Sequence, residues 1–216
     1  MLGHGPEAWH PNPAFFYENG GGPMMDLGPY YITALVHLLG PAKSVSGNTS
    51  AGFNQRICGH EDKKGEKIPV EVPTHFSGTI NFQNGAVITV VMSFDVWGHK
   101  HPCFELYGTE GSMSLPNPNS FGGPVEILRS KQKEWISTPL SHGYTDNYRS
   151  IGLADMAYAI QSGRKNRCSG ELATHVLEIM STFEKSSNAG KRIDLQTTCA
   201  QPNALPLDLV EGQLDT

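Results

Sequence analysis

The alternation of apolar and polar residues on both sides of Asn84-Gly85 constrains the fold of this chain more than any other feature. Apolar and polar residues alternate over residues 75–82, and the alternation resumes over residues 86–94. Asparagine followed by glycine supplies the positive backbone dihedrals of a tight hairpin turn. The sequence therefore predicts a long antiparallel β-hairpin. Shorter strands are expected at residues 44–57, 103–107, 112–115, 125–129 and 134–137.

Three segments have the three- and four-residue apolar spacing of helices. In residues 26–39 this spacing ends at Gly40-Pro41, Asp26 is a plausible cap, and Pro29 is expected within the first turn. The other helices are expected at residues 148–162 and 171–187, the second capped by Ser169 and ended by Gly190.

Helices that flank a run of strands indicate an α+β fold: a large, mostly antiparallel, open β-sheet with helices packed on one face. The other face then needs solvent or a partner chain. The length of 216 residues suits one domain, which we place at residues 1–200, followed by an extended tail at 201–216 where the periodicity is lost.

Composition excludes several classes of protein. A net charge of -5 without a run of basic residues does not suit nucleic-acid binding. No stretch approaches the roughly 18 apolar residues of a membrane span. The 4 cysteines lie far apart, which fits neither a zinc ribbon nor a disulfide scaffold and favours a cytoplasmic location.

The segment GGGPMMDLGPYY at residues 20–31, which runs into Leu38-Leu39-Gly40, resembles the signature of the Gfo/Idh/MocA oxidoreductase family. The resemblance continues through residues 3–13, 104–111, 152–157 and 169–173, up to about residue 206. It implies the C-terminal, substrate-binding and oligomerisation domain of an oxidoreductase that uses NAD or NADP. Family members form homodimers or homotetramers through the open sheet face.

The family's dinucleotide-binding elements are not found in this sequence. Members carry a Rossmann domain with a Gly-rich phosphate loop and a Glu-Lys-Pro motif, and neither motif occurs here. We therefore expect no Rossmann domain in this chain and no cofactor bound by the chain alone. Which nicotinamide cofactor the intact enzyme uses is encoded outside these residues.

Asp26 and Tyr30 are the candidate catalytic residues. They are four residues apart, so on one helix their side chains share a face and can converge on one substrate hydroxyl. Family members usually have His at the second position, and Tyr there makes a sugar, cyclitol or diol substrate plausible. Without the resemblance, an Asp near a helix start is commonly a cap, and a Tyr on an apolar stripe is commonly core.

His10 and Trp9 are candidate substrate contacts, because they offer ring donors and an aromatic surface for sugar hydroxyls. Gly21 and Gly22 are candidates for the nicotinamide side of a cofactor site, with an ordinary turn as the alternative. His99 and His101 lack a third ligand at suitable spacing, so no metal site is predicted. Two further functions stay open: a non-catalytic binding or oligomerisation module, and an NAD-dependent glycoside hydrolase.

Overall fold

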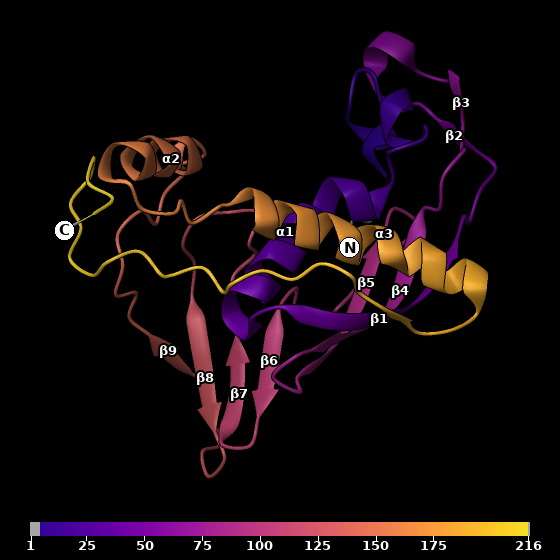
Figure 1. The fold of residues 1–216 in the computed structure, drawn as a ribbon. Helices are drawn as coiled ribbons and strands as arrows, with labels where there is room; N and C mark the ends of the chain where they lie inside the picture. The colour runs from indigo at the N-terminus through magenta and orange to yellow at the C-terminus, as the bar shows by residue number, and fades with distance from the viewer. Residues whose placement is uncertain (1–4, 216) are drawn as a thin grey trace. The chain divides into compact units, whose positions relative to one another are not determined.

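A computed structural model describes residues 5–215, which divide into two compact units (Figure 1). The helix–sheet unit contains residues up to 99 together with residues 170–201. The second unit contains residues 100–169 and the C-terminal segment from 202 onward. All strand pairs in the described part of the chain are antiparallel, and the predicted α+β class with antiparallel sheets is confirmed.

The helix–sheet unit is built on a four-stranded sheet with the order β10-β1-β4-β5. The strands are β1 (Ala42–Ser50), β4 (His75–Phe82), β5 (Val87–Ser93) and β10 (Ile193–Asp194). The long hairpin predicted around Asn84-Gly85 is β4 and β5.

The hairpin's turn differs from the two-residue turn that the sequence suggested. Gly85 donates its N–H to the Phe82 carbonyl at 3.1 Å, which places Gln83 and Asn84 at the centre of the turn. Of the pair Asn84-Gly85, only Gly85 has a positive φ, of 92°. The result is a three-residue loop with glycine at its left-handed position, which is also a common hairpin connection.

The expected strand at residues 44–57 is two strands. It is divided between β1 and the short strand β2 (Gln55–Ile57), which pairs with β3 (Lys67–Pro69) in a separate two-stranded sheet. Two 3₁₀ turns, η1 (Pro6–Ala8) and η2 (Ala14–Phe16), precede the first helix, and a third, η3 (Glu61–Lys63), lies between β2 and β3. Tyr17 packs with Cys58, Ile68 and Phe94 in a small core beneath this region.

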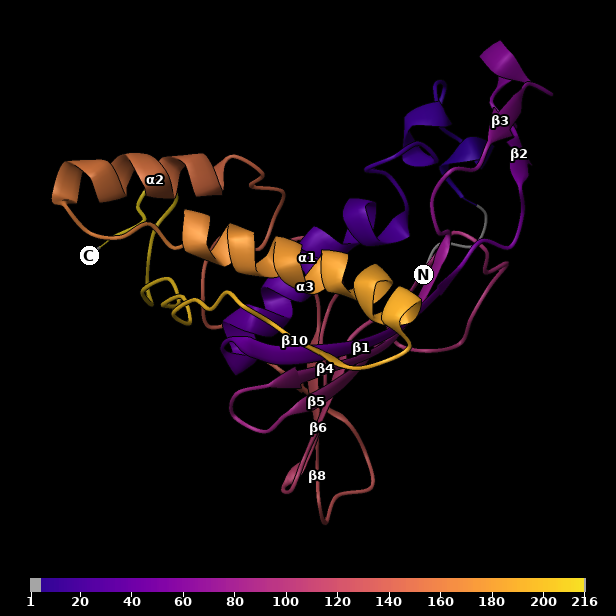
Figure 2. The ribbon, with the colours of Figure 1, turned by 45° about the vertical axis from the view of Figure 1, so that its right-hand side comes forward.

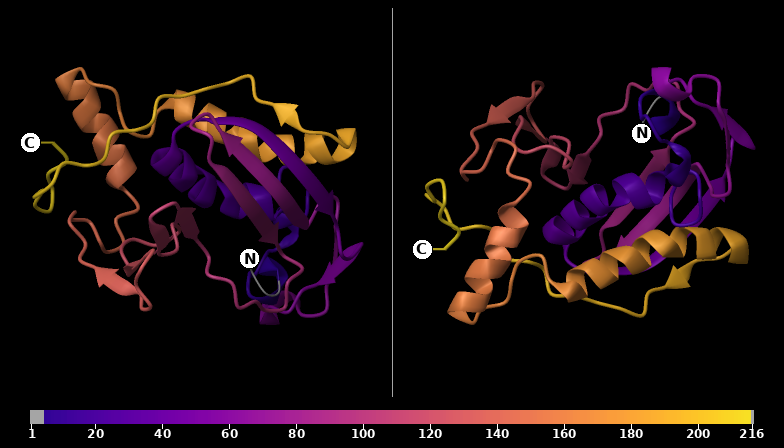
Figure 3. Two further views of the ribbon diagram at one scale, coloured as in Figure 1. Left: turned by 90° about the horizontal axis from the view of Figure 1, so that it is seen from below. Right: turned by 90° about the horizontal axis from the view of Figure 1, so that it is seen from above.

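Helices α1 (Pro23–Leu39) and α3 (Gly170–Ala189) both cover one face of the β1-β4-β5 sheet (Figures 2 and 3). Strand residues on that face, including Phe76, Ile80 and Val90, are buried against them. Phe183 of α3 lies over Gly47 and Gly78, where an added Cβ would come within 2.6 Å of the Phe183 carbonyl oxygen and 3.1 Å of its ring, respectively. Two adjacent strands thus have glycine where α3 approaches the sheet.

The start of α1 differs from the expectation. The helix begins at Pro23 with Gly22 as the N-cap residue, so Asp26 is its fourth residue and does not cap it. Gly22 has a φ of 89°, a conformation that glycine adopts without strain. Pro29 therefore lies inside the helix, where it removes the amide that would bond to the Met25 carbonyl, and not within the first turn as expected.

The second unit contains a sheet with the order β6-β7-β8-β9, formed by β6 (Glu105–Gly108), β7 (Gly111–Ser114), β8 (Val125–Arg129) and β9 (Ile136–Thr138). Helix α2 (Ile151–Ser162) follows these strands. Part of the C-terminal segment is held to this unit, since Tyr158 Oη donates to the Gly212 carbonyl and Arg164 pairs with Asp215 at 2.9 Å. The domain division at residue 200 stays a prediction.

No helix among residues 5–215 combines the length and the apolar character that crossing a membrane requires.

Candidate functional site

The predicted site residues all belong to the helix–sheet unit, on α1 and on the loop that leads into it. Asp26 and Tyr30 lie four residues apart on α1, so their side chains project from the same face of the helix. Asp26 is half-buried, and Tyr30 has 36% of its surface exposed. One face of α1 therefore carries both the partly buried carboxyl of Asp26 and, one turn further along, the solvent-accessible phenol of Tyr30.

The Asp26 carboxyl is not stabilised in its charged form by neighbouring groups. Burial raises its pKa above the ordinary value, since removing a carboxylate from water disfavours the charge. No hydrogen bond to this carboxylate is made by any residue between 5 and 215. A desolvated carboxyl without partners costs stability, and such groups are concentrated at sites of proton transfer.

Asp26→Asn is therefore expected to raise the free energy of unfolding at neutral pH, by less than about 1 kcal/mol because the group is only half-buried. The folded-state pKa lies above 3.8, so the cost of the wild-type charge appears as pH rises through that value and the folded pKa. Urea unfolding at pH 7 and pH 4 would test this, with the advantage of the variant shrinking at pH 4. A clear loss of stability at pH 7 would show that the carboxylate has a structural role.

His10 and Trp9 form part of an aromatic cluster that also contains Phe15 and Phe16. The His10 ring meets the rings of Trp9, Phe15 and Phe16 edge-on, with centroids 5.3, 5.4 and 5.3 Å away. Trp9 is 59% and Phe15 51% exposed. Nδ1 of His10 accepts the Asn12 N–H at 3.0 Å. This cluster, called here the aromatic wall, presents ring surface to solvent.

Backbone hydrogen bonds connect the aromatic wall to the start of α1. The Gly22 N–H donates to the Phe16 carbonyl at 2.7 Å, and the Asp26 N–H donates to the Gly22 carbonyl at 3.0 Å. These bonds connect the loop that carries the aromatic wall to the first turn of α1 within the same unit.

Close packing within the chain accounts for the absence of side chains at Gly21 and Gly22. A Cβ on Gly21 would lie 2.7 Å from the Phe15 carbonyl oxygen, and one on Gly22 would lie 2.9 Å from that of Pro73. The space at these positions is filled by the protein's own backbone. Their proposed contact with a nicotinamide ring stays a prediction.

A buried charged cluster beneath this region was missed by the sequence analysis. It contains Glu7, Arg56 and Asp95, all of which are poorly exposed to solvent. The three residues come from η1, β2 and the bend after β5, far apart in the sequence. The only signal was an isolated Arg between Gln55 and Ile57, which gave no indication of its partners.

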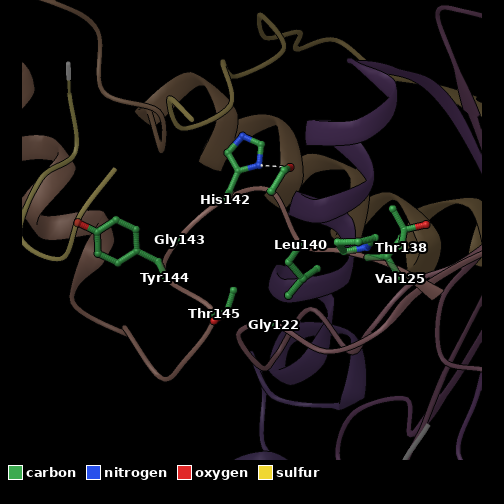
Figure 4. Close-up of a pocket in the computed structure, with 10 residues that line it drawn as sticks. Gly122, Val125, Thr138, Leu140, His142, Gly143, Tyr144 and Thr145 are labelled. Atoms are coloured by element: carbon green, nitrogen blue, oxygen red, sulfur yellow. Dashed lines mark hydrogen bonds between the residues drawn. The ribbon is translucent and has the colours of Figure 1, made fainter. Parts of the chain in front are cut away.

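The second unit has an open pocket of about 380 Å³ between β8, β9 and the loop after β9 (Figure 4). Ser141 Oγ and His142 Nδ1 lie 3.0 Å apart at its rim. None of its lining residues was predicted to be functional, and all of them belong to the other unit from Asp26 and Tyr30. Size alone does not make this pocket the site.

No group of three His, Cys, Asp or Glu side chains within the described range is arranged to hold a metal ion.

The described residues form an antiparallel α+β fold, with Asp26 and Tyr30 on the first helix of the helix–sheet unit. The chain belongs to the Gfo/Idh/MocA family, because the model of its C-terminal domain matches residues 2–114, more than half of the 216 residues. It is thus a C-terminal domain of that oxidoreductase family, as the resemblance predicted.

Solved structures of oxidoreductases share the fold. Levoglucosan dehydrogenase in its apo form has a TM-score of 0.70 and 20% identity, with 88% of this chain and 57% of that chain covered. Its complex with NADH and L-sorbose has a TM-score of 0.68 and 21% identity, covering 88% and 56%. Aldose-aldose oxidoreductase from Caulobacter crescentus, complexed with glycerol, has a TM-score of 0.64 and 20% identity, covering 89% and 53%.

The chain therefore spans little more than half the length of these structures. None of the curated protein sequences matches this chain.

Proposed function

We propose that this chain is the substrate-binding domain of an NAD(P)-dependent oxidoreductase that acts on a hydroxyl of a sugar, cyclitol or diol. The observation that carries the proposal is the half-buried Asp26 carboxyl on the same helix face as Tyr30. Burial raises the pKa of this carboxyl, and no residue in the described range 5–215 donates a hydrogen bond to it. Similar solved structures bind NADH with L-sorbose, or glycerol. L-Sorbose and glycerol are both polyhydroxylated molecules, and the exposed rings of the aromatic wall would contact a ligand of this kind.

Asp26 and Tyr30 would act on the proton of the substrate hydroxyl. Oxidation of a carbinol requires a group that accepts this proton, and reduction requires a group that returns it. The Tyr30 phenol would donate its proton to the substrate oxygen in the reduction, and the Tyr30 oxygen would receive the hydroxyl proton in the oxidation. The Asp26 carboxyl would orient the hydroxyl by accepting a hydrogen bond. Trp9 and His10 would contact the carbon face and the outer hydroxyls of the ring.

A bound nicotinamide would accept the hydride in the oxidation and supply it in the reduction. The described residues do not fit a dinucleotide, because the strand pairs are antiparallel and the spaces beside Gly21 and Gly22 are filled by backbone. We therefore assign no residue here to the cofactor phosphates. The dinucleotide would be held by a nucleotide-binding domain that pairs with this one.

Titration of the purified chain with L-sorbose and, separately, with NADH and NADPH tests the proposal. We expect millimolar binding of the sugar and no saturable binding of either dinucleotide at micromolar concentration. Tyr30→Phe should weaken sugar binding about 3- to 10-fold, as expected for the loss of one hydrogen bond to a ligand. Leu38→Ala, an exposed change further along α1, is the matched control.

Absence of any effect of sugars or polyols would favour a non-catalytic binding or oligomerisation module. Binding of a glycoside in preference to the free sugar would favour the glycoside hydrolase alternative. Micromolar NADH binding by the chain alone would contradict the separate nucleotide-binding domain.

We also propose that the sheet face opposite α1 and α3 pairs with a second copy of the chain. On this face, neighbouring strands align Asn48 with Ser77 and Val91, and Ser46 with Thr79 and Thr89. Val87 and Val91 are 61% and 37% exposed. Small polar side chains with exposed valines make a flat surface that suits pairing of two sheets.

Val91→Arg is expected to convert a dimer into a monomer, since like charges would meet across a two-fold interface. Sedimentation equilibrium would measure the mass of both proteins. Leu177→Arg changes an exposed side chain of α3, away from this sheet face. It is the control and should leave the mass in solution unchanged. A monomeric wild-type chain would remove the basis for this interface.

A further inference from the structure

We propose that Arg56 is a positioning residue for the site, which clamps the loop carrying the aromatic wall to the sheet. This inference rests on the proposed function, because it assigns the wall a role in holding substrate. Arg56 itself is buried and does not belong to the predicted site.

The Arg56 guanidinium bridges two carboxylates from distant segments. Its Nη1 lies 3.2 Å from Glu7 Oε1, and its Nη2 pairs with Asp95 Oδ1. Nη2 also donates to the Phe94 carbonyl at 3.4 Å. The Arg56 and Glu7 side chains are only 9% and 10% exposed. One planar cation on β2 thus connects η1 to the bend that follows β5.

Hydrogen bonds hold both carboxylates in place. Tyr17 Oη donates to Glu7 Oε2, while the Thr74 hydroxyl and the Gly52 N–H donate to Asp95 Oδ2 at 2.7 and 3.1 Å. Burial, and then the bond to Glu7, raises the pKa of Tyr17, so its phenol remains a donor at neutral pH. Only a forked cation can satisfy both carboxylates at once.

Residues linked to Arg56 lie at both ends of the loop that carries the aromatic wall. Glu7 lies two residues before Trp9, and Tyr17 directly follows Phe16. The Arg56 guanidinium carbon also lies 4.6 Å from the centre of the Phe53 ring and 5.7 Å from that of Tyr17. Removing the cation leaves two buried carboxylates next to each other, which repel and release η1.

We expect the loss of Arg56 to release only the loop that carries the aromatic wall, while the sheet and its helices stay folded. Besides the Arg56 cluster, the loop is held by the packing of Tyr17 in its small core and by the hydrogen bond from Lys63 Nζ to Asn12 Oδ1 at 2.8 Å. Backbone bonds add to these, such as the Gly59 N–H to the Glu7 carbonyl at 2.8 Å. The sheet beneath α1 and α3 has a separate core around Phe183 and Ile80. Local opening of a weakly attached segment costs less free energy than unfolding of the core.

Hydrogen–deuterium exchange of the full chain tests this. In Arg56→Met, amides of residues 8–22 should exchange at least about tenfold faster, while those of β1, β4 and α3 should change less than about twofold. Arg56→Lys, which keeps the charge but lacks the fork, should give an intermediate rate. Arg192→Met, which removes an exposed arginine paired with Asp194 at 3.8 Å, is the charge-matched control.

A second readout reports the position of the wall. In a background with Trp97→Phe and Trp135→Phe, Trp9 is the only tryptophan, and its fluorescence anisotropy should fall in Arg56→Met and recover partly in Arg56→Lys. L-Sorbose affinity should fall at least about fivefold in Arg56→Met, because the loop must first be ordered.

The outcomes separate this inference from the proposed function. Faster exchange throughout the helix–sheet unit, or unchanged exchange of residues 8–22, would overturn the positioning role. Failure of L-sorbose to bind the wild-type chain would overturn the proposed substrate class, and the exchange and anisotropy measurements would still decide whether Arg56 holds the loop.

Discussion

Phe183→Ala is expected to lower the free energy of unfolding of the helix–sheet unit by about 3–5 kcal/mol, the range for removal of a buried phenylalanine. The Phe183 side chain is fully buried on α3 and its ring lies over Gly78 of β4, while the Phe183 backbone lies against Gly47 of β1. Glycines have no side chains that could move into the cavity, so the loss should fall near the upper end of the range. Urea unfolding followed by hydrogen exchange of β1 and β4 would measure it.

Leu177→Ala is the matched control for Phe183→Ala. It truncates a large apolar side chain on the same helix, but Leu177 is 53% exposed. Its effect should stay within about 0.5 kcal/mol. A loss below about 1 kcal/mol in Phe183→Ala would mean that α3 does not depend on this contact with the sheet.

The hairpin and the helices could be predicted because each depends on local periodicity. Alternation over residues 75–94 determines which strand residues face the helices, and the apolar spacing identified α1 and α3 within a few residues. The exact start of α1 could not be predicted, because Gly22 acts through its backbone conformation and through its closeness to Pro73. These depend on a contact with the segment before β4, about 50 residues further along the chain.

The candidate site was predicted in part, since Asp26 and Tyr30 share a helix whose period is visible in the sequence. The partners of the aromatic wall were not predicted, because Phe15 and Phe16 resembled ordinary loop residues. The ion pairs of Arg56 with Glu7 and Asp95 join segments 49 and 39 residues apart. No local pattern marks such a pairing, and charge alone suggests a solvent-exposed residue.

His175 should make the helix–sheet unit sensitive to acid. Its Nε2 accepts the Ala42 N–H at 3.0 Å, and its Nδ1 lies 3.0 Å from Thr197 Oγ1. The Thr197 hydroxyl in turn donates to Glu178, so Nδ1 carries the proton and the ring is neutral. Protonating Nε2 would place its N–H against the Ala42 N–H. Burial lowers the pKa of His175, despite the opposing charge of Glu178.

The sign of the pH effect follows from this lowered pKa. Below the ordinary value of 6.5 the unfolded chain binds a proton that the folded state resists, so stability falls as pH decreases from 6.5 through the folded pKa. Protonation of Glu178 causes a second loss of folding stability at lower pH. Burial raises its pKa, but bonds from Thr197 and the Gln196 amide outweigh burial, so its contribution is lost below 4.5.

His175→Leu is expected to lower the free energy of unfolding by about 2–4 kcal/mol at neutral pH, because the buried Ala42 amide loses its acceptor. The decline between pH 6.5 and 5 should become shallower, since one of the histidines that cause it is absent. His37, whose pKa burial also lowers, contributes to the same range, so His37→Gln is the matched control. Urea midpoints from pH 4 to 8, followed by exchange of β1 and α3, would measure both. An unchanged decline in His175→Leu would contradict this role of His175.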